Sequence, residues 1–304
     1  MSRQCASCDR WLSRGSYSNN QWRKPSGVAR CHACVNGGSS SGGGGGSNSS
    51  SSHFDPAQTA RRNDASQATF EHGALDYPFA EGGFRWVAKG RYTHGNRAGQ
   101  ACVCKWFKTG AVYESTFFDL DIKAMNKALE LIEKWNYSRM INRLIQINIP
   151  EVWTFMPNSG GGWAGRKCLQ EPYIQNYEKF NSNTGWAEDS TPWPRVMQAL
   201  SHYSYHVSGG QFVLCDLQGG VYAESVVLTD PVILSQTKAY GVTDLGPHGI
   251  STFFSNHRCN EFCKAAWRRP ADQRQYFRPQ QGTSMMRPQN VPTRRSRPMQ
   301  TFYE

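Results

Sequence analysis

The hydrophobic and polar positions divide the chain into a patterned middle and two flanks without pattern. Residues 37–52 contain only Gly, Ser and one Asn, so they cannot build a core and are typical of a flexible linker. Residues 53–72 stay polar, whereas aromatic residues and short apolar runs are dense from Tyr77 to Trp267. We therefore predict a module at 1–36, a linker at 37–72 and a folded domain at 73–267.

Two segments of the middle have a clear period. Residues 100–107, QACVCKWF, alternate and end in aromatic residues, which predicts a β-strand. Residues 119–136 predict an amphipathic helix that packs on that sheet. Its apolar stripe consists of Leu120, Ile122, Met125, Leu129, Ile132 and Trp135. Beyond the domain, five prolines interrupt residues 268–304, so we predict a disordered basic tail there.

Composition excludes some classes of protein. A hydrophobic content of 38% over 304 residues fits a folded protein. No apolar run approaches the roughly 18–20 residues that span a bilayer, and the start MSRQCASCDR lacks the apolar core of a secretory signal. We therefore expect no membrane partner.

The net charge of +11 lies in the flanks. Residues 1–36 hold six Lys or Arg and one acid, and residues 268–304 hold eight Arg and two acids, so the middle is neutral. An acidic or nucleic-acid partner is therefore expected only through the flanks.

The first flank carries the pattern C-x2-C-x22-C-x2-C, formed by Cys5, Cys8, Cys31 and Cys34. Four thiolates make a closed structural zinc site, although the central spacing exceeds the usual range of roughly 15–20 residues. The alternative is four unrelated free cysteines. Clustered cysteines favour metal binding in a reducing compartment, the cytoplasm or the nucleus.

The segment between these cysteine pairs resembles small four-cysteine zinc modules of other eukaryotic proteins. Trp11, Tyr17 and Trp22 alternate there with Arg and Lys. This mixture suits RNA or single-stranded nucleic acid, but the same aromatic residues would equally cover a zinc site while the charges are solvated.

Two features of the middle domain suit phosphate binding. Lys105 lies inside the predicted strand, and a strand-borne lysine is how kinases hold ATP phosphates. Gly82 and Gly83 precede Arg85 and predict a turn that lets the backbone approach a ligand. Each feature alone is unspecific, because most strand lysines face solvent.

Four longer stretches occur in an informative order. They are EPYIQNYEKFNSNTGW (171–186), ALSHYSYHVSGGQFVLCDLQGG (199–220), LTDPVILS (228–235) and GVTDLGPHGISTFFSNHRCNEFC (241–263). In this order, and over residues 77–267, the chain resembles the alpha-kinases, the group of the myosin heavy chain kinases and elongation factor 2 kinase. It has neither H-R-D-L nor D-F-G, the signatures of ordinary protein kinases.

The resemblance implies an α+β fold, a two-lobed kinase-like domain with an integrated zinc site, here preceded by the four-cysteine module. It implies ATP contacts from Lys105 and Arg85 to the phosphates and from Glu171 at the adenine hinge. The remaining residues that it implies near the nucleotide are Lys179, Asn181, Asn183 and Asp216.

The resemblance also implies roles for three further groups. Gln218 and Asp230 would hold magnesium, and Asp230 would accept or orient the proton of the substrate hydroxyl. Gly241, Gly246 and Gly249 would form a loop near the peptide substrate. From local sequence alone, Asp230 before Pro231 reads as a turn residue, and Asn181 and Asn183 read as an ordinary loop.

His257, Cys259 and Cys263 offer three metal ligands within seven residues. The two cysteines share one face if a helix starts there. The resemblance implies His202 as the fourth ligand of a structural zinc site, whereas spacing alone leaves His202 as a core residue and His206 as a rival. The remaining cysteines would be small hydrophobic residues: Cys102, Cys104, Cys168 and Cys215.

Two departures from the family pattern are visible. The segment GGVYAESVVLTD before and including Asp230 is longer than the family's loop, and Asp244 stands where the family often has Asn.

The sequence therefore predicts an ATP-dependent serine/threonine protein kinase that transfers the γ-phosphate of Mg-ATP, with Mg²⁺ and two Zn²⁺ as cofactors. The alternative is a non-catalytic adaptor or a nucleic-acid-binding zinc-finger protein on the same fold. The joint presence of Lys105, Gln218 and Asp230 favours the enzyme, because a scaffold has no need for all three.

Overall fold

The computed structural model divides the chain into two compact units, Met1–Ser52 and His53–Glu304. The residues that it describes are 2–5, 11–17, 19–25, 28–29, 55–188 and 191–282. None of the helices in these ranges is long and apolar enough to cross a membrane.

The first unit contains a two-stranded antiparallel sheet, β1 (Ser2–Gln4) with β2 (Trp11–Ser13), and a short helix α1 (Asn19–Trp22). Cys5 and Tyr17 are buried together, and the Arg14 guanidinium lies over the Trp22 ring. Cys8, Cys31 and Cys34 lie outside the described residues, so the four-cysteine zinc site stays a prediction.

The second unit is built on two larger sheets. The first has the order β4-β6-β7-β10-β9 with β5 on β6, and all its pairings are antiparallel. Its strands are β4 (Ala65–Phe70), β5 (Ala80–Glu81), β6 (Arg85–Gly95), β7 (Ala101–Phe107), β9 (Glu151–Thr154) and β10 (Lys167–Pro172). The strand predicted at 100–107 is thus confirmed as β7.

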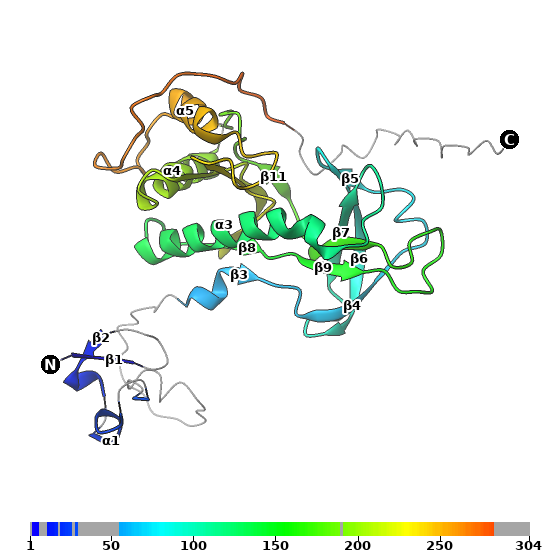
Figure 1. Ribbon diagram of the computed structural model, residues 1–304, viewed down its shortest axis with the longest axis horizontal. Helices are drawn as coiled ribbons and strands as arrows, with labels where there is room; N and C mark the ends of the chain where they lie inside the picture. Colours follow the sequence, from blue (N-terminus) through cyan, green and yellow to red (C-terminus); the bar gives the residue numbers. More distant parts are fainter. Residues whose placement is uncertain are drawn as a thin grey trace. The chain divides into compact units, whose positions relative to one another are not determined.

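The second sheet has the mixed order β11-β13-β14-β8-β3, and a two-stranded ribbon of β12 and β15 accompanies it. Its strands are β3 (Ala60–Arg61), β8 (Leu144–Asn148), β11 (Tyr177–Lys179), β13 (Gln218–Val221) and β14 (Ser225–Thr229), and the ribbon is β12 (Phe212–Cys215) with β15 (Val232–Ser235). The described residues of this unit also form three α-helices, α3 (Asp119–Ser138), α4 (Pro192–Val207) and α5 (Gly246–Asn256) (Figure 1). The predicted α+β class is confirmed.

Helix α3 confirms the helix predicted at 119–136. Asp119 and Asp121 lie in its first turn, where acidic side chains stabilise the helix dipole. Arg139 ends the helix in the left-handed conformation, with φ of 51°. The buried stripe differs from the predicted one at its start, because Leu120 is 51% exposed.

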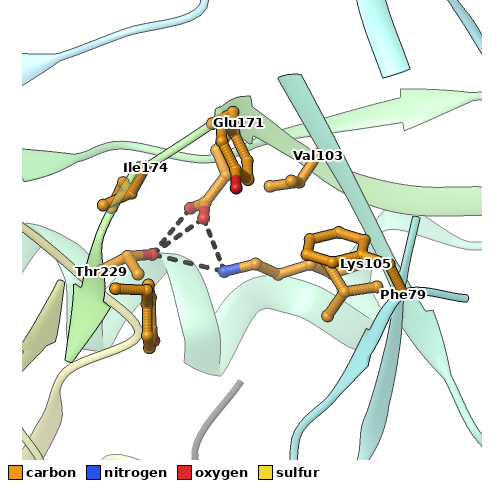
Figure 2. A pocket seen from close by; sticks show the side chains of 9 residues that line it. Phe79, Val103, Lys105, Glu171, Ile174 and Thr229 are labelled. Atoms are coloured by element: carbon orange, nitrogen blue, oxygen red, sulfur yellow. Dashed lines mark hydrogen bonds and ion pairs between the residues drawn. The ribbon is translucent and has the colours of Figure 1, made fainter. Parts of the chain in front are cut away.

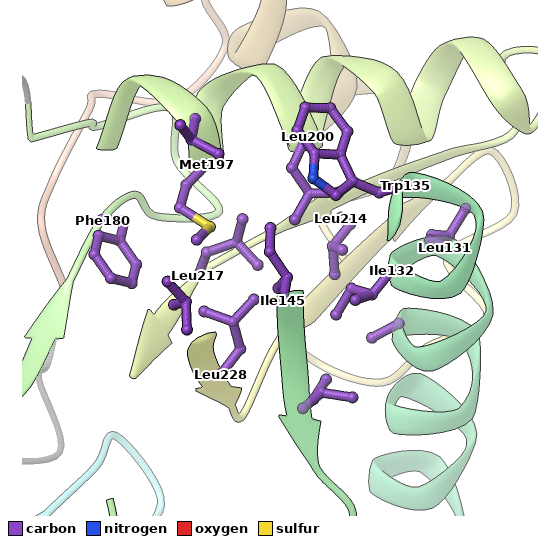
Figure 3. Close-up of a cluster of buried hydrophobic side chains, with 14 of the residues drawn as sticks. Leu131, Ile132, Trp135, Ile145, Phe180, Met197, Leu200, Leu214, Leu217 and Leu228 are labelled. Atoms are coloured by element: carbon purple, nitrogen blue, oxygen red, sulfur yellow. The ribbon is translucent and has the colours of Figure 1, made fainter. Parts of the chain in front are cut away.

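The main core lies between α3, α4 and strands of the second sheet (Figure 3). Leu131, Ile132 and Trp135 from α3 meet Leu200 from α4 and Ile145 from β8, and all are buried. Burial of each such side chain contributes roughly 1.5–3 kcal/mol relative to exposure. The core therefore fixes α4 against the second sheet, and α4 and this sheet carry residues of both sites described below.

The predicted linker boundary at residue 72 is wrong, because β3 and β4 belong to the second unit. Thr59 and Asn63 are polar yet fully buried. Asn63 donates a hydrogen bond of 2.9 Å to the Gln170 carbonyl, and Arg61 donates two of 3.2 Å to the Tyr173 carbonyl. Polar residues are integrated here through hydrogen bonds, which a hydrophobic pattern cannot indicate.

The predicted tail boundary at residue 268 is also wrong. The Arg268 amide donates to His206 Nδ1 on α4 over 3.2 Å, and the Tyr276 amide donates to Thr252 Oγ1 on α5 over 2.9 Å. Residues 268–282 therefore pack on the second unit, whereas residues 283–304 lie outside the described residues.

Candidate active site

Asp216 and Asp230 mark the two places where the chain passes between the β12–β15 ribbon and the second sheet. Asp216 follows β12 and precedes β13, and Asp230 follows β14 and precedes β15. Both have a left-handed backbone, with φ of 57° and 46°. Such strained positions cluster at functional sites, and here the two crossings bring both carboxylates to the same end of the ribbon.

The long segment between these aspartates forms a regular hairpin of β13 and β14. Its register places Gln218 opposite Thr229. The residues between Gln218 and Thr229 therefore extend the ladder away from the site, and they leave Gln218 beside the strand end that leads to Asp230.

Lys105 lies at the centre of a buried polar group. Its ammonium is 2.5 Å from Asp230 Oδ2 and 2.6 Å from Glu171 Oε1, and it donates to Thr229 Oγ1 over 3.3 Å. The Thr229 hydroxyl lies 2.9 Å from Glu171 Oε2 (Figure 2). β7 supplies Lys105, β10 supplies Glu171 and β14 supplies Thr229, so the two sheets meet at this group.

Electrostatics keep this lysine charged. Burial lowers the pKa of Lys105, but the carboxylates of Asp230 and Glu171 outweigh burial and raise its pKa overall. Burial raises the pKa of Glu171, and the Lys105 ammonium opposes that rise. Removal of both carboxylates would leave the Lys105 ammonium as an uncompensated buried charge, which would destabilise the fold.

A small pocket opens beside Lys105 (Figure 2). Its walls are mainly apolar or aromatic: Phe79, Val87, Val103, Tyr173, Ile174 and Tyr177, with Lys105, Glu171 and Thr229 as polar members. An apolar slot that ends in a few convergent polar groups is typical of a small-molecule site. The Tyr177 hydroxyl is buried here and has no hydrogen-bond partner among the described residues.

Lys179, Asp216 and Gln218 form a second polar group. Lys179 Nζ is 3.0 Å from Asp216 Oδ1, and Gln218 Nε2 donates to Asp216 Oδ2 over 3.2 Å. Burial raises the pKa of Asp216, which Lys179 opposes. Gln218 Nε2 also lies 3.5 Å from the Asp230 carbonyl, while Gln218 Oε1 is buried without a partner in the described part of the chain.

Three residues expected near the nucleotide have protein partners instead. Asn181 donates to Ser201 Oγ and accepts from the Leu217 amide, and Asn183 donates to the Thr243 carbonyl. Arg85 follows the Gly82 turn but pairs with Asp121 of α3 over 2.7 Å. Their contact with ATP therefore stays a prediction.

His202, His257, Cys259 and Cys263 converge, with one ligand atom from each lying within 4.8 Å of the others. Cys259 Sγ is 3.7 Å from His202 Nδ1 and 3.7 Å from His257 Nε2. Helix α5 ends at Asn256, so the two cysteines come from an irregular segment and not from a helix. His206 is directed elsewhere, because its Nδ1 accepts from the Arg268 amide.

The second nitrogen of each histidine is oriented by an oxygen. His202 Nε2 lies 3.1 Å from the Arg268 carbonyl, and His257 Nδ1 lies 3.3 Å from Gln198 Oε1. Each oxygen accepts a hydrogen bond from the ring N–H that faces it, which leaves the inward nitrogen with a lone pair for a metal. Burial lowers the pKa of His202 to about 4 and that of His257 to about 3, so both rings are neutral and suited to bind a metal.

A family model described as the alpha-kinase family matches residues 80–263. The chain belongs to the alpha-kinase family. Most residues of both sites above lie inside this match, because the range includes Arg85 at one end and Cys263 at the other.

Curated protein kinases also match this chain. Alpha-protein kinase 1 of Dictyostelium discoideum is 31% identical over 195 residues, which cover 61% of this chain and 13% of that protein. Human eukaryotic elongation factor 2 kinase is 36% identical over 108 residues, which cover 34% of this chain and 14% of that protein. The chain thus matches only a small part of each relative's length.

Solved alpha-kinase structures share the fold. The C-terminally truncated domain of myosin heavy chain kinase has a TM-score of 0.54 at 22% identity, covering 64% of this chain and 87% of that one. An alpha-kinase from Entamoeba histolytica has a TM-score of 0.54 at 24% identity, covering 68% and 82%.

The alpha-kinase glycines occupy different local settings. Gly241 lies five residues before the start of α5 and has φ of 89°. Gly246 begins α5 with φ of 68°, and Gly249 lies within α5. A Cβ on Gly249 would lie 2.6 Å from Leu245 Cβ and 3.0 Å from Leu234, so its absence lets α5 pack closely on β15. Contact of these glycines with a peptide stays a prediction.

Asp244 organises the loop before α5 as an acceptor. Its Oδ1 accepts from the Ser235 and Gly246 amides over 2.9 Å each, and its Oδ2 accepts from Ser235 Oγ over 2.6 Å and the Tyr240 amide over 3.3 Å. The side chain is buried at 4% exposure. Four donors explain why a carboxylate fits here, since an ionised carboxylate accepts at both oxygens.

Asp244→Asn is expected to lower the free energy of unfolding by about 1–3 kcal/mol, because the new amide group would face the Tyr240 N–H and leave a buried donor unsatisfied. Urea unfolding of the variant, of Ser235→Ala and of the double variant would measure this. Wild-type stability in Asp244→Asn would show that the loop rearranges to satisfy an amide.

Sequence reasoning missed Thr229 and Tyr177. Thr229 lies within the quoted LTD motif, but its role depends on Glu171, 58 residues earlier. Tyr177 lies between Glu171 and Lys179 in the sequence. Tyr177 and Lys179 are two residues apart on β11, and only this spacing could have indicated that both side chains face one side of the sheet.

Proposed function

We propose that this alpha-kinase transfers the γ-phosphate of Mg-ATP to a Ser or Thr hydroxyl of a protein. The observation that carries the proposal is the meeting of Lys105, Asp216, Gln218 and Asp230 beside an apolar pocket. Phosphoryl transfer needs a cation for the phosphates, oxygen ligands for magnesium and a carboxylate at the attacking hydroxyl. One myosin heavy chain kinase neighbour was solved in complex with ATP, which supports the same ligand here.

The apolar pocket would receive the adenine, and the buried Tyr177 hydroxyl offers a hydrogen bond that no described residue takes. Lys105 is charged and would exchange a carboxylate partner for a phosphate oxygen. Asp230 would then be released from the ammonium and would accept the proton of the substrate hydroxyl.

Gln218 Oε1 fits a magnesium ligand, because it is a buried oxygen without a partner beside two carboxylates. Mg²⁺ prefers such oxygen donors. Gln218 and Asp230 would hold the ion, with Asp216 oriented by Lys179. When bound, the ion supplies positive charge to the phosphate oxygens.

Incubation of the purified chain with Mg-ATP and a panel of Ser/Thr peptides, read by mass spectrometry, tests the proposal. Phosphoserine or phosphothreonine that depends on Mg²⁺ supports a kinase. ATP binding without transfer to any peptide, to a basic protein or to the chain itself would favour the non-catalytic adaptor.

We propose that the His/Cys group is a structural zinc site. Two neutral histidines and two cysteines are a frequent tetrahedral set for Zn²⁺ and leave no open position for chemistry. The oriented ring nitrogens support this assignment. Free thiolate ligands suit a reducing compartment, so we propose the cytoplasm or the nucleus.

The four N-terminal cysteines predict a second zinc ion, which can be counted. We expect two zinc ions per full-length chain and one per chain that lacks residues 1–52. Elemental analysis of both proteins after gel filtration would measure these ratios. One zinc in the full-length chain and one in the shortened chain would remove the N-terminal assignment.

A further inference from the structure

Residues 270–282, here called the strap, follow the His/Cys group and run along α5. Arg269 begins this path by donating to Cys259 Sγ over 3.2 Å and to the Phe254 carbonyl over 3.3 Å. Ser251 Oγ on α5 then donates to the Arg274 carbonyl over 2.9 Å. The strap is therefore fixed at its start to the segment that carries the metal ligands.

The middle of the strap is held by side chains of α5. Thr252 Oγ1 accepts from the Tyr276 amide over 2.9 Å and the Phe277 amide over 3.2 Å. The Tyr276 ring stacks on His248, with ring centroids 4.1 Å apart and an interplanar angle of 14°. His248 lies between Gly246 and Gly249 in the first turn of α5, and the family resemblance assigns these glycines a place near the peptide substrate.

The end of the strap reaches the second polar group of the candidate active site. Thr184 Oγ1 accepts from the Gln280 amide over 3.0 Å and lies 3.1 Å from the Gln280 carbonyl. A Cβ built on Gly282 would lie 3.5 Å from Lys179 Nζ. Lys179 in turn pairs with Asp216. The strap therefore runs from His248, between Gly246 and Gly249, to the residues proposed for phosphoryl transfer.

The strap resembles a bound peptide in two respects. Most of the hydrogen bonds above reach its backbone, so a different extended chain could make them, and only the stacked aromatic ring adds side-chain preference. The strap contains no Ser or Thr between residues 270 and 282, so it offers no hydroxyl to accept a phosphate.

We propose that residues 276–282 occupy the groove through which the acceptor peptide enters, and that the strap thereby competes with the protein substrate. This inference rests on the proposed kinase function. The inference also defines the substrate segment. It would be an extended chain with an aromatic side chain that stacks on His248 and with backbone amides that hydrogen-bond to Thr252 and Thr184. The strap is then an intramolecular pseudosubstrate.

Tyr276→Ala tests the competition, with Tyr276→Phe as the matched control that keeps the ring. Stacked aromatic pairs contribute about 0.5–1.5 kcal/mol, so the KM for the peptide is expected to fall by about 2- to 12-fold in Tyr276→Ala. The kcat and the KM for ATP are expected to stay at the wild-type values, and Tyr276→Phe to match the wild type. Thermal melts check that all three proteins are folded.

A synthetic peptide of residues 272–282 provides the second measurement. It is expected to inhibit Tyr276→Ala competitively against the substrate peptide and not against ATP. The same peptide with Ala at position 276 is expected to inhibit more weakly. Competition with ATP would place the strap in the nucleotide site and overturn the proposal.

The outcomes separate the two proposals. Transfer by all three proteins with an equal KM for the peptide, and no inhibition by the strap peptide, overturns the strap inference alone. Absence of transfer in all three proteins overturns the kinase function and the strap inference with it.

Discussion

Asp230→Asn is expected to lower the rate of phosphoryl transfer by about 10²-fold or more, the usual loss when a group that acts on the transition state is removed. Asn keeps the shape of the side chain but cannot take the proton of the hydroxyl. Lys105 keeps its ion pair of 2.6 Å with Glu171, so the buried group remains charge-paired. The measurement is kcat/KM with a peptide, beside a thermal melt.

Asp64→Asn is the matched control for this change. Asp64 also has a left-handed backbone, with φ of 45° against 46° at Asp230, but it is exposed and pairs with Arg97 over 3.8 Å. It reports the effect of the same substitution in the same backbone conformation without the site. Near-normal kcat/KM in Asp230→Asn would instead assign the proton acceptor to Asp216, whose carboxylate also lies beside Gln218.

Cys259→Ser is expected to lower the melting temperature strongly and to abolish activity, because the zinc proposed for the His/Cys group would join segments that are far apart in sequence. Its ligands come from His202 on α4 and from the segment after α5, 57 residues later. Structural zinc binds with free energies on the order of 10 kcal/mol, which is comparable to the total stability of roughly 5–15 kcal/mol of a domain. Chelation of zinc in the wild type is expected to have the same effect.

A chain of hydrogen bonds also connects the proposed metal site with the candidate active site. Ser201, next to His202, accepts from Asn181, and Asn181 accepts from the amide of Leu217, which separates Asp216 from Gln218. A shift of α4 after metal loss would therefore reach Asp216 and also Gln218, one of the two residues proposed to hold magnesium. This path explains why activity is expected to fall together with stability.

Deletion of residues 1–52 is the contrasting control, because these residues form a separate compact unit. The shortened chain is expected to melt and to phosphorylate a short peptide like the full-length protein. A Cys259→Ser protein with wild-type melting and activity would show that the His/Cys group is not structural. Loss of peptide activity on deletion would show that the N-terminal module supports the kinase domain.

Local periodicity was sufficient to predict the type and bounds of an element where one face of that element is buried along its length. Strand β7 and helix α3 lie within two residues of the predicted bounds, because their apolar residues pack on the core and set the period. Lys105 was identified from the same pattern, as a cation inside an otherwise apolar strand. The order of longer motifs then indicated the family, and with it Gln218, Asp230 and His202.

The sequence by itself thus determined β7, α3 and the candidate charged residues of the site, since these follow from side-chain type at short spacing and from the order of the motifs. Only the tertiary structure decided their partners. Glu171, expected at the adenine hinge, pairs with Lys105 from 66 residues earlier, and Thr229 joins them from a third strand. β3 and the strap were missed for a related reason: they are held by hydrogen bonds from backbone groups and polar side chains, and a hydrophobic pattern carries no information on such bonds.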